Sequence, residues 1–275
     1  MGRVAVLGLG LMGGSIARAI SELQIADRVT GWSPVSSERD AALTVGAVTF
    51  AAAGWREAVA DADLVVVATP LSATLKLVGE IGDATGSHVT VTDVAGLKAP
   101  LEEAASRGGL ADRWVGSHPM AGSESSGFWA SRADLFQGAR VWIVAAEAAN
   151  DHRLTVERLW SGIGAVPCGI GAAEHDRLMA SVSHLPQLVA NILAEVLEQA
   201  GVDPDRLGPG GRDMTRLAAS DPGMWADILA HASPALVGAL RGVSDGARRM
   251  ADRLEAEDLE AIVQVMKRTG GWRGR

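Results

Sequence analysis

The sequence predicts an α/β protein in which a doubly wound sheet is followed by an all-helical region. Over residues 1–171, short apolar strands alternate with helical segments, which is typical of a doubly wound sheet. A glycine-rich loop follows the first of these strands directly. From residue 172 onward, apolar residues recur at three- and four-residue steps, as in amphipathic helices. We therefore predict a dinucleotide-binding domain of the Rossmann type at residues 1–171 and a helical domain at residues 172–275.

Continuous apolar runs that end in turns mark the strands of the first domain. The run at residues 63–70 (DLVVVATP) is typical of a parallel strand covered on both faces. The predicted strands occupy residues 3–10, 28–33, 63–70, 87–96, 112–119, 139–146 and 165–170. Helical segments between them are predicted at residues 13–23, 37–46, 71–81 and 98–108.

The second domain begins with a long amphipathic helix at residues 172–201. Its apolar stripe comprises Leu178, Val182, Leu185, Val189, Ile192 and Val196. Pro186 lies inside this stretch and predicts a kink near residues 182–185. Asp221 and Pro222 form a helix start, with Asp as the N-cap. The apolar surface exceeds what a lone bundle of this size needs, so we expect a homodimer through the helical domain.

Composition narrows the possible partners of the chain. The formal net charge is −8, and Lys and Arg form no block that could follow a phosphate backbone, so a nucleic-acid partner is not expected. No apolar run reaches membrane-spanning length, and the N-terminus enters a strand without a targeting segment. A single cysteine excludes an intramolecular disulfide. These features favour a cytoplasmic protein that binds no membrane.

The loop after the first strand has the spacing G-x-G-x-x-G and consists of Gly8, Leu9, Gly10, Leu11, Met12 and Gly13. The first glycine permits a tight turn, the second allows the backbone to approach a pyrophosphate, and the third lets helix and strand pack closely. The helix N-terminus then faces the anion. Gly8, Gly10, Leu11, Met12 and Gly13 are therefore candidate cofactor-binding residues.

The sequence leaves the choice between NAD and NADP open. The acidic residue that commonly binds the adenosine ribose is expected about 20 residues after the loop. That position reads Trp32-Ser33-Pro34, where Ser33 could bond either a ribose hydroxyl or a 2′-phosphate. Arg39 would suit a phosphate, but Glu38 would not.

Further candidates lie at the ends of the next two strands. Thr69 and Pro70 end one strand at the carboxyl edge, where open α/β sheets bind ligands. Asp93 ends the following strand, and either caps the next helix or serves the cofactor site, to which Gly96 in the same loop would also belong. Lys98 is expected to be a solvated helix charge.

The segment Gly116–Glu124 (GSHPMAGSE) carries the candidate base. His118 is expected in a loop that follows a strand, and an unperturbed imidazole can take a proton near neutral pH. Oxidation of an alcohol beside a nicotinamide requires such a proton acceptor. Glu124 either contacts substrate or imidazole, or is only a helix-start carboxylate.

The helical domain offers two more candidates, each of which could instead be solvated. His184 shares a polar helix face with Arg177 and precedes Pro186. Arg216 points away from the apolar face of its segment and could pair with a carboxylate. The run Glu174-His175-Asp176 lacks a second ligand pair at suitable spacing, so we attribute it to an acid-rich helix start and expect no metal site.

Taken together, these motifs resemble the prephenate/arogenate dehydrogenase family of tyrosine biosynthesis over nearly the whole chain. The motifs are GLGLMGGS, ATP, DVAGLK, GSHPMAGSESSG, EHDRLMASVSHLP and RLAASDPGMW. The resemblance implies oxidative decarboxylation of a small anionic cyclohexadienyl substrate with hydride transfer to NAD or NADP, at a site between the two domains. It also implies that His118 accepts the hydroxyl proton, that Arg216 binds a substrate carboxylate, and that Glu124 and His184 line the pocket.

One departure and several alternatives stay open. Many relatives have a serine that orients the histidine where this chain has Gly96, and a water, Ser117 or Ser123 could replace it. The motifs do not distinguish prephenate from arogenate or from an amino-substituted analogue. A β-hydroxyacid dehydrogenase or imine reductase would use a lysine on the long helix, which here carries none. A non-catalytic dinucleotide-binding sensor would need no ordered set of His, Glu and Arg.

Overall fold

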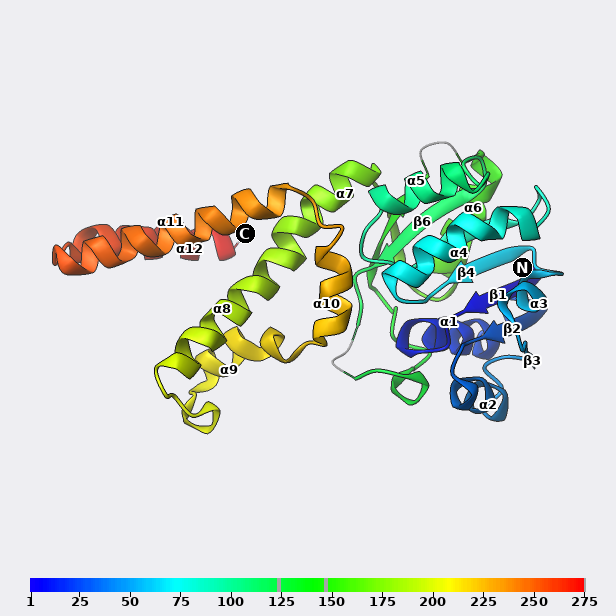
Figure 1. Cartoon of the computed structure of the whole chain (residues 1–275), viewed down its shortest axis with the longest axis horizontal. Helices are drawn as coiled ribbons and strands as arrows, with labels where there is room; N and C mark the ends of the chain where they lie inside the picture. The colour runs from blue at the N-terminus through cyan, green and yellow to red at the C-terminus, as the bar shows by residue number, and fades with distance from the viewer. Residues whose placement is uncertain (123–124, 146–147, 275) are drawn as a thin grey trace. The chain divides into compact units, whose positions relative to one another are not determined.

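The computed structural model describes residues 1–122, 125–145 and 148–274, which group by their contacts into two compact units (Figure 1). The first unit comprises Met1–Met179 and Ser220–Ala232, and the second comprises Ala180–Ala219 and Ser233–Arg275. The domain boundary expected between residues 171 and 172 stays a prediction.

The first unit contains an eight-stranded sheet in the order β3-β2-β1-β4-β5-β6-β7-β8. Neighbouring strands are parallel except β6 and β7, which pair antiparallel. The strands are β1 (Arg3–Leu7), β2 (Arg28–Trp32), β3 (Phe50–Ala51), β4 (Leu64–Val67), β5 (Thr90–Asp93), β6 (Trp114–Pro119), β7 (Arg140–Val144) and β8 (Val166–Gly169). The predicted α/β class is confirmed. Three elements, β3, α3 and α6, fall where the sequence analysis placed no strand or helix.

Helices cover both faces of this sheet (Figure 1). The helices of the first unit are α1 (Leu11–Glu22), α2 (Ser36–Thr44), α3 (Trp55–Val59), α4 (Leu71–Ala84), α5 (Ala99–Arg107), α6 (Asn150–Gly162), α7 (Ala172–Met179) and α10 (Pro222–Leu229). Side chains alternate along the strands, so Val4 and Val6 pack on the α1 and α6 side, whereas Ala5 and Leu7 pack on the α4 and α5 side. This alternation between two dry faces explains why the central strands are apolar without interruption.

Helix α10 returns to the first unit and packs against α4. Asp221 caps α10 by accepting a hydrogen bond from the Met224 amide at 2.7 Å, as the Asp-Pro pair predicts. Asp227 then accepts hydrogen bonds from the amide of Ser72 (2.9 Å) and from its hydroxyl, in the first turn of α4. These bonds lower the pKa of Asp227 below its ordinary value.

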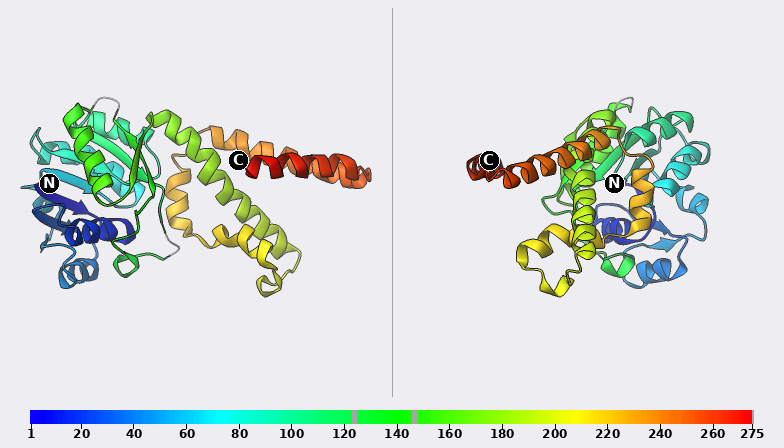
Figure 2. Two further views of the ribbon diagram at one scale, coloured as in Figure 1. Left: turned by 180° about the vertical axis from the view of Figure 1, so that it is seen from behind. Right: turned by 60° about the vertical axis from the view of Figure 1, so that its left-hand side comes forward.

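The second unit is helical. It contains a π-helical turn at Ala180–His184, then α8 (Leu185–Gln199), α9 (Pro209–Thr215), α11 (Ala235–Glu255) and α12 (Leu259–Arg273), and α11 and α12 run side by side (Figure 2). The π-helical turn falls at the place where Pro186 predicts an irregularity, because proline cannot donate the hydrogen bond that would continue the helix there. Among the described residues, no helix is both long enough and apolar enough to span a membrane.

Candidate active site

The glycine loop joins β1 to α1 in the conformation that its sequence requires. Gly8 has φ +97°, and a Cβ there would lie 2.4 Å from the Ala68 carbonyl oxygen. A Cβ on Gly13 would lie 1.8 Å from the Gly8 carbonyl oxygen, so neither glycine can be replaced without moving backbone. Both glycines are therefore needed to close the loop against the carboxyl end of β4.

Gly10 differs from its neighbours because the space beside it is open. The nearest atom to a Cβ on Gly10 is Glu38 Oε1, at 3.8 Å. Gly10 is also the N-cap of α1, no side chain caps the helix there, and its first turn carries no acidic residue. The amides that begin this helix, at Leu11 and Met12, therefore fit the pyrophosphate of a dinucleotide, which needs donors and close backbone approach.

At the end of β2, Ser33 and Glu38 form a pair beside the glycine loop. The Ser33 hydroxyl donates to Glu38 Oε2 at 2.5 Å, and the Ser33 carbonyl accepts from Arg39 Nη1 at 2.5 Å. Glu38 Oε1 faces the open side of Gly10. The structure thus brings a carboxylate to the place where the sequence seemed to lack one, because the first turn of α2 folds back over the strand end.

The candidates at Thr69 and Pro70 connect β4 to α4. Pro70 is the N-cap residue of α4, and the Thr69 hydroxyl lies 2.9 Å from the Thr74 hydroxyl. Thr74 Oγ1 also bonds the Thr69 carbonyl oxygen at 2.8 Å. These bonds fix the carboxyl end of β4 next to Gly8. Contact of Thr69 or Pro70 with a cofactor stays a prediction.

His118 lies within β6 and not in a loop as expected, because β7 continues to pair with β6 through Pro119. The residue before it is held firmly. The Ser117 hydroxyl accepts from Trp160 Nε1 at 2.9 Å and bonds Thr92 Oγ1 at 2.7 Å. Since β1, β4, β5 and β6 run parallel, His118 reaches the same carboxyl edge of the sheet as the glycine loop.

The His118 ring is joined to α7 by two successive hydrogen bonds. His118 Nδ1 lies 2.9 Å from His175 Nε2, and His175 Nδ1 lies 2.8 Å from Asp176 Oδ1. Asp176 in turn accepts the amides of Lys98 and Ala99, each at 2.9 Å. We refer to His118, His175 and Asp176 as the histidine relay.

Neither of the two relay members on α7 stood out in the sequence, where the run Glu174-His175-Asp176 was read as an acid-rich helix start. His175 is fully buried and Asp176 nearly so. The signal in the sequence was a histidine directly next to a carboxylate, in the helix that follows the last strand. Among the residues that the structure describes, no group of His, Cys, Asp and Glu could hold a metal ion.

Lys98 is fully buried, so its expected place in solvent is wrong. Its ammonium contacts Asp93 Oδ1 and donates to the Ser117 carbonyl oxygen at 2.7 Å. Asp93 also accepts from the Ala95 amide at 2.9 Å. Burial raises the pKa of Asp93 and lowers that of Lys98, while the charge of each partner opposes the shift. Contact of Asp93 with a cofactor stays a prediction, and its side chain has no exposed surface.

The structure places Gly96 directly beside the base. A Cβ on Gly96 would lie 3.8 Å from His118 Nε2, an ordinary van der Waals distance.

The other three catalytic candidates do not lie in the described part of the first unit. His184 ends the π-helical turn and is buried, and Arg216 begins a 3₁₀ turn at Arg216–Ala219, both in the second unit. Glu124 lies outside the described residues. The roles of all three stay predictions.

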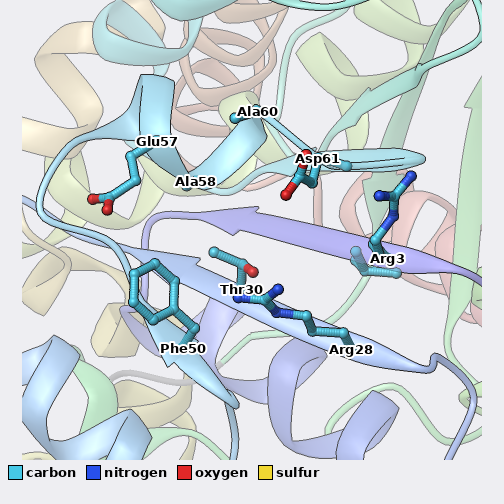
Figure 3. A pocket seen from close by; sticks show the side chains of 10 residues that line it. Arg3, Arg28, Thr30, Phe50, Glu57, Ala58, Ala60 and Asp61 are labelled. Atoms are coloured by element: carbon cyan, nitrogen blue, oxygen red, sulfur yellow. The ribbon is translucent and has the colours of Figure 1, made fainter.

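A cavity of ≈ 210 Å³ lies at the opposite edge of the sheet (Figure 3). Arg3 and Arg28, the first residues of β1 and β2, line it together with Phe50. The Arg28 guanidinium lies over the Phe50 ring, with Cζ 5.6 Å from the ring centroid. None of the candidate site residues lines this cavity. It is therefore separate from the edge at which parallel sheets bind nucleotides.

A glycine loop at a helix N-terminus and a histidine at the same sheet edge define a nicotinamide-dependent dehydrogenase. Comparison with known proteins agrees. Residues 16–168 match the prephenate dehydrogenase nucleotide-binding domain, and residues 171–268 match the prephenate dehydrogenase dimerization domain. The chain belongs to the prephenate dehydrogenase family, which confirms the resemblance seen in its motifs, and it is an NAD(P)-dependent oxidoreductase.

Individual relatives show the same similarity. The chain is 30% identical to the prephenate dehydrogenase of Bacillus subtilis over 98% of its own length and 75% of that protein. It is 28% identical to the cyclohexadienyl dehydrogenase of Zymomonas mobilis over 96% of its length and 92% of that protein. A crystal structure of Aquifex aeolicus prephenate dehydrogenase with hydroxyphenyl propionate and NAD+ superposes with a TM-score of 0.91, at 26% identity, covering 99% and 97% of the two chains.

Proposed function

We propose that this chain oxidatively decarboxylates prephenate at the sheet edge that carries Gly10 and His118. The observation that carries the proposal is an imidazole held at the same edge as an open, uncapped helix N-terminus. In prephenate, a ring carboxylate lies para to a hydroxyl on a cyclohexadiene. A nicotinamide held at the glycine loop would supply the acceptor for the hydride from the carbon that bears this hydroxyl.

His118 handles the proton of this reaction. It accepts the hydroxyl proton as the carbon–oxygen bond gains double-bond character. The bond to the ring carboxylate then breaks, CO2 leaves, and its electron pair makes the ring aromatic. The oxygen becomes a phenolate and takes the proton back from His118. Prephenate and NAD(P)+ thus give 4-hydroxyphenylpyruvate, CO2 and NAD(P)H without net release of a proton.

Three further residues are proposed to act on the substrate. Arg216 binds a substrate carboxylate, for which a guanidinium is suited because it can donate two parallel hydrogen bonds. His184 and Glu124 line the substrate pocket. The support for all three is the agreement of their motifs with the family, together with the match of both domains.

His118→Asn tests the assignment of the base. We expect kcat to fall by about 10²–10⁴-fold, the usual contribution of general base catalysis. The thermal unfolding midpoint should stay within a few degrees of wild type, because His118 is only half-buried. His88→Asn, which makes the same change at an exposed histidine just before the amino end of β5, is the control. Wild-type turnover in His118→Asn would exclude His118 as the base.

We also propose that the enzyme prefers NAD to NADP. Glu38 places a half-buried carboxylate beside Gly10, held by Ser33. A carboxylate accepts hydrogen bonds from the ribose hydroxyls of NAD, whereas it repels a 2′-phosphate. Arg39 is the group that opposes this preference, and one of its five N–H donors is already bonded to the Ser33 carbonyl.

Glu38→Gln tests this preference. We expect the ratio of kcat/KM for NAD to that for NADP to fall by about 10- to 100-fold, the usual value of a hydrogen bond to a charged group. Glu57→Gln, on α3, whose carboxylate accepts the Ala53 amide at 2.8 Å and contacts neither Ser33 nor Gly10, should leave the ratio unchanged. An unaltered ratio in Glu38→Gln would exclude Glu38 as the determinant.

The helical unit is proposed to form a homodimer. Large apolar side chains on α8, α11 and α12 are exposed, among them Val196, Leu254, Val263, Met266 and Trp272. Such a surface is typical of an interface with a second copy. Light scattering at micromolar concentration should give twice the chain mass, and the substitution Met266→Glu should reduce the measured mass to that of a single chain. A monomeric wild type would refute the dimer.

The substrate and the location are tested separately. Wild-type enzyme is assayed with prephenate and with arogenate, each with NAD and with NADP, by following nicotinamide absorbance. Faster turnover of arogenate would reverse the assignment, and cofactor binding without turnover of either acid would favour a non-catalytic sensor. Cell fractionation tests the proposed cytoplasmic location.

A further inference from the structure

We propose that His175 is a positioning residue that fixes the tautomer of His118, so that Nε2 of His118 is the atom that exchanges the substrate proton. The inference rests on the proposed role of His118 as the base. It concerns the histidine relay, in which His175 Nε2 lies 2.9 Å from His118 Nδ1 and His175 Nδ1 lies 2.8 Å from Asp176 Oδ1.

Asp176 determines the direction of hydrogen-bond donation in the relay. Its carboxylate accepts two backbone amides, from Lys98 and Ala99. Burial alone would raise the pKa of Asp176, but the hydrogen bonds from His175 and the two amides outweigh burial and leave that pKa below its ordinary value. An ionised carboxylate only accepts hydrogen bonds, so His175 Nδ1 carries the proton that it receives.

The tautomer of His175 then determines that of His118. With its proton on Nδ1, a neutral His175 ring presents Nε2 as an acceptor. His118 Nδ1 must therefore donate, and its own lone pair lies on Nε2. The two rings meet edge to face, with centroids 5.1 Å apart and planes at 71°, which suits a bond between ring nitrogens. Asp176 thus sets the protonation of His118 through His175.

The orientation is productive because of what lies beside Nε2. Gly96 approaches that nitrogen, and a Cβ there would lie 3.8 Å away. Here the ring is held from its other side, by His175 at Nδ1. His175 therefore orients the ring without occupying space next to Nε2.

The relay also acts during the reaction. When His118 accepts a proton, its Nδ1–H becomes part of a cation, and hydrogen bonds from charged groups are about twice as strong as neutral ones. The bond to His175 therefore strengthens as the proton moves. An interaction that strengthens only then lowers the barrier and not the substrate affinity, so its loss should appear in kcat and not in KM.

Two variants of His175 form a matched pair. In His175→Gln, the side-chain oxygen can occupy the place of Nε2 and still accept from His118. In His175→Asn, the amide can occupy the place of Nδ1 and bond Asp176, but it stops short of His118. We expect His175→Asn to lower kcat by about 10- to 100-fold with little change in KM, and His175→Gln to retain kcat within about threefold.

Nuclear magnetic resonance gives a readout that does not depend on activity. With ¹⁵N-labelled histidine, long-range ¹H–¹⁵N correlations of the wild-type enzyme should show His118 protonated on Nδ1 and unprotonated on Nε2 at neutral pH. The chain has six histidines, and spectra of His118→Asn assign the signals. A His118 ring protonated on Nε2 would overturn the inference, even if both His175 variants fail to fold.

The two proposals fail in different ways. If the wild type turns over neither cyclohexadienyl acid, the proposed function is wrong, while the NMR spectrum still decides the tautomer. If the wild type is active and His175→Asn keeps its kcat, the positioning role is wrong and the proposed function stands. Equal losses of kcat in both His175 variants, with both folded, would likewise refute the positioning role.

Discussion

Replacing the buried Lys98 with methionine tests how the carboxyl edges of β5 and β6 are held together. Methionine keeps most of the length and the apolar stem of lysine but loses the ammonium. That ammonium contacts Asp93 and donates to the Ser117 carbonyl oxygen at 2.7 Å, next to His118. After the change, the Ala95 amide still donates to Asp93 at 2.9 Å, but the ammonium that balances its charge is gone.

The magnitude follows from the burial of both charges. The side chains of Lys98 and Asp93 are both 0% exposed. Removing one partner of such a pair leaves the other charge buried and uncompensated, which costs about 3–5 kcal/mol. Because Asp93→Asn removes that remaining charge, the double variant Asp93→Asn/Lys98→Met should be more stable than Lys98→Met alone.

The loss should also depend on pH. Burial raises the pKa of Asp93 in the folded state, and removing Lys98 raises it further above the unfolded value of about 3.9. An acid with a raised folded pKa contributes stability below its unfolded pKa, and that contribution is lost as the pH rises through the folded pKa. Lys98→Met should therefore lose more stability at pH 8 than at pH 5.

Urea unfolding at both pH values measures the effect. Lys76→Met, on the exposed side of α4, is the matched control and should change the free energy of unfolding by less than about 0.5 kcal/mol. The assigned role of the buried pair is wrong if the free energy of unfolding of Lys98→Met lies within about 1 kcal/mol of the wild-type value, about a third of the smallest expected cost. It is also wrong if the variant loses the same stability at pH 5 and at pH 8.

Four further changes probe the glycine positions and the proposed substrate arginine. Gly10→Ala should fold normally but raise the KM for NAD, because its Cβ enters the open side of the loop, whereas Gly13→Ala should lower the unfolding midpoint, because its Cβ would meet a carbonyl oxygen at 1.8 Å. Gly96→Ser should fold normally, since its Cβ stays 3.8 Å from His118 Nε2, and a lowered midpoint would contradict that spacing. Arg216→Ala should chiefly raise the KM for prephenate, and an unchanged KM in steady-state assays would refute carboxylate binding.

Much of the fold is predictable because local patterns and tertiary packing agree. The continuous apolar run of β4 needs only the rule that a strand covered on both faces is apolar throughout. Gly8 and Gly13 follow from the spacing of the loop alone. The register of His118 does not follow, because it depends on an antiparallel partner, β7, that comes more than 20 residues later.

The electrostatic part of the site could not be predicted, because it joins residues that are distant in sequence. In the sequence, Lys98 looks like any lysine at a helix start. Its burial depends on the distant Gly116, because a Cβ on Gly116 would lie only 3.1 Å from Lys98 Cδ. In the sequence, His175 and Asp176 look like part of an acid-rich helix start. Their role becomes visible only in the structure, where α7 packs against α5. Composition and periodicity describe each segment by itself, so they cannot reveal a hydrogen bond between residues 57 positions apart.

The position of His175 has a consequence for how the gene could be divided. A fragment that ends at residue 171 retains the sheet and the glycine loop, yet it lacks His175 and Asp176, the two members of the histidine relay on α7. A fragment that ends at Met179 retains them but lacks α10, whose Asp227 bonds the start of α4. Recombination with a foreign helical region would therefore preserve a nucleotide-binding module while leaving its histidine without the ring that orients it. Exchange of functional parts between relatives must instead carry α7 and α10 along with the sheet.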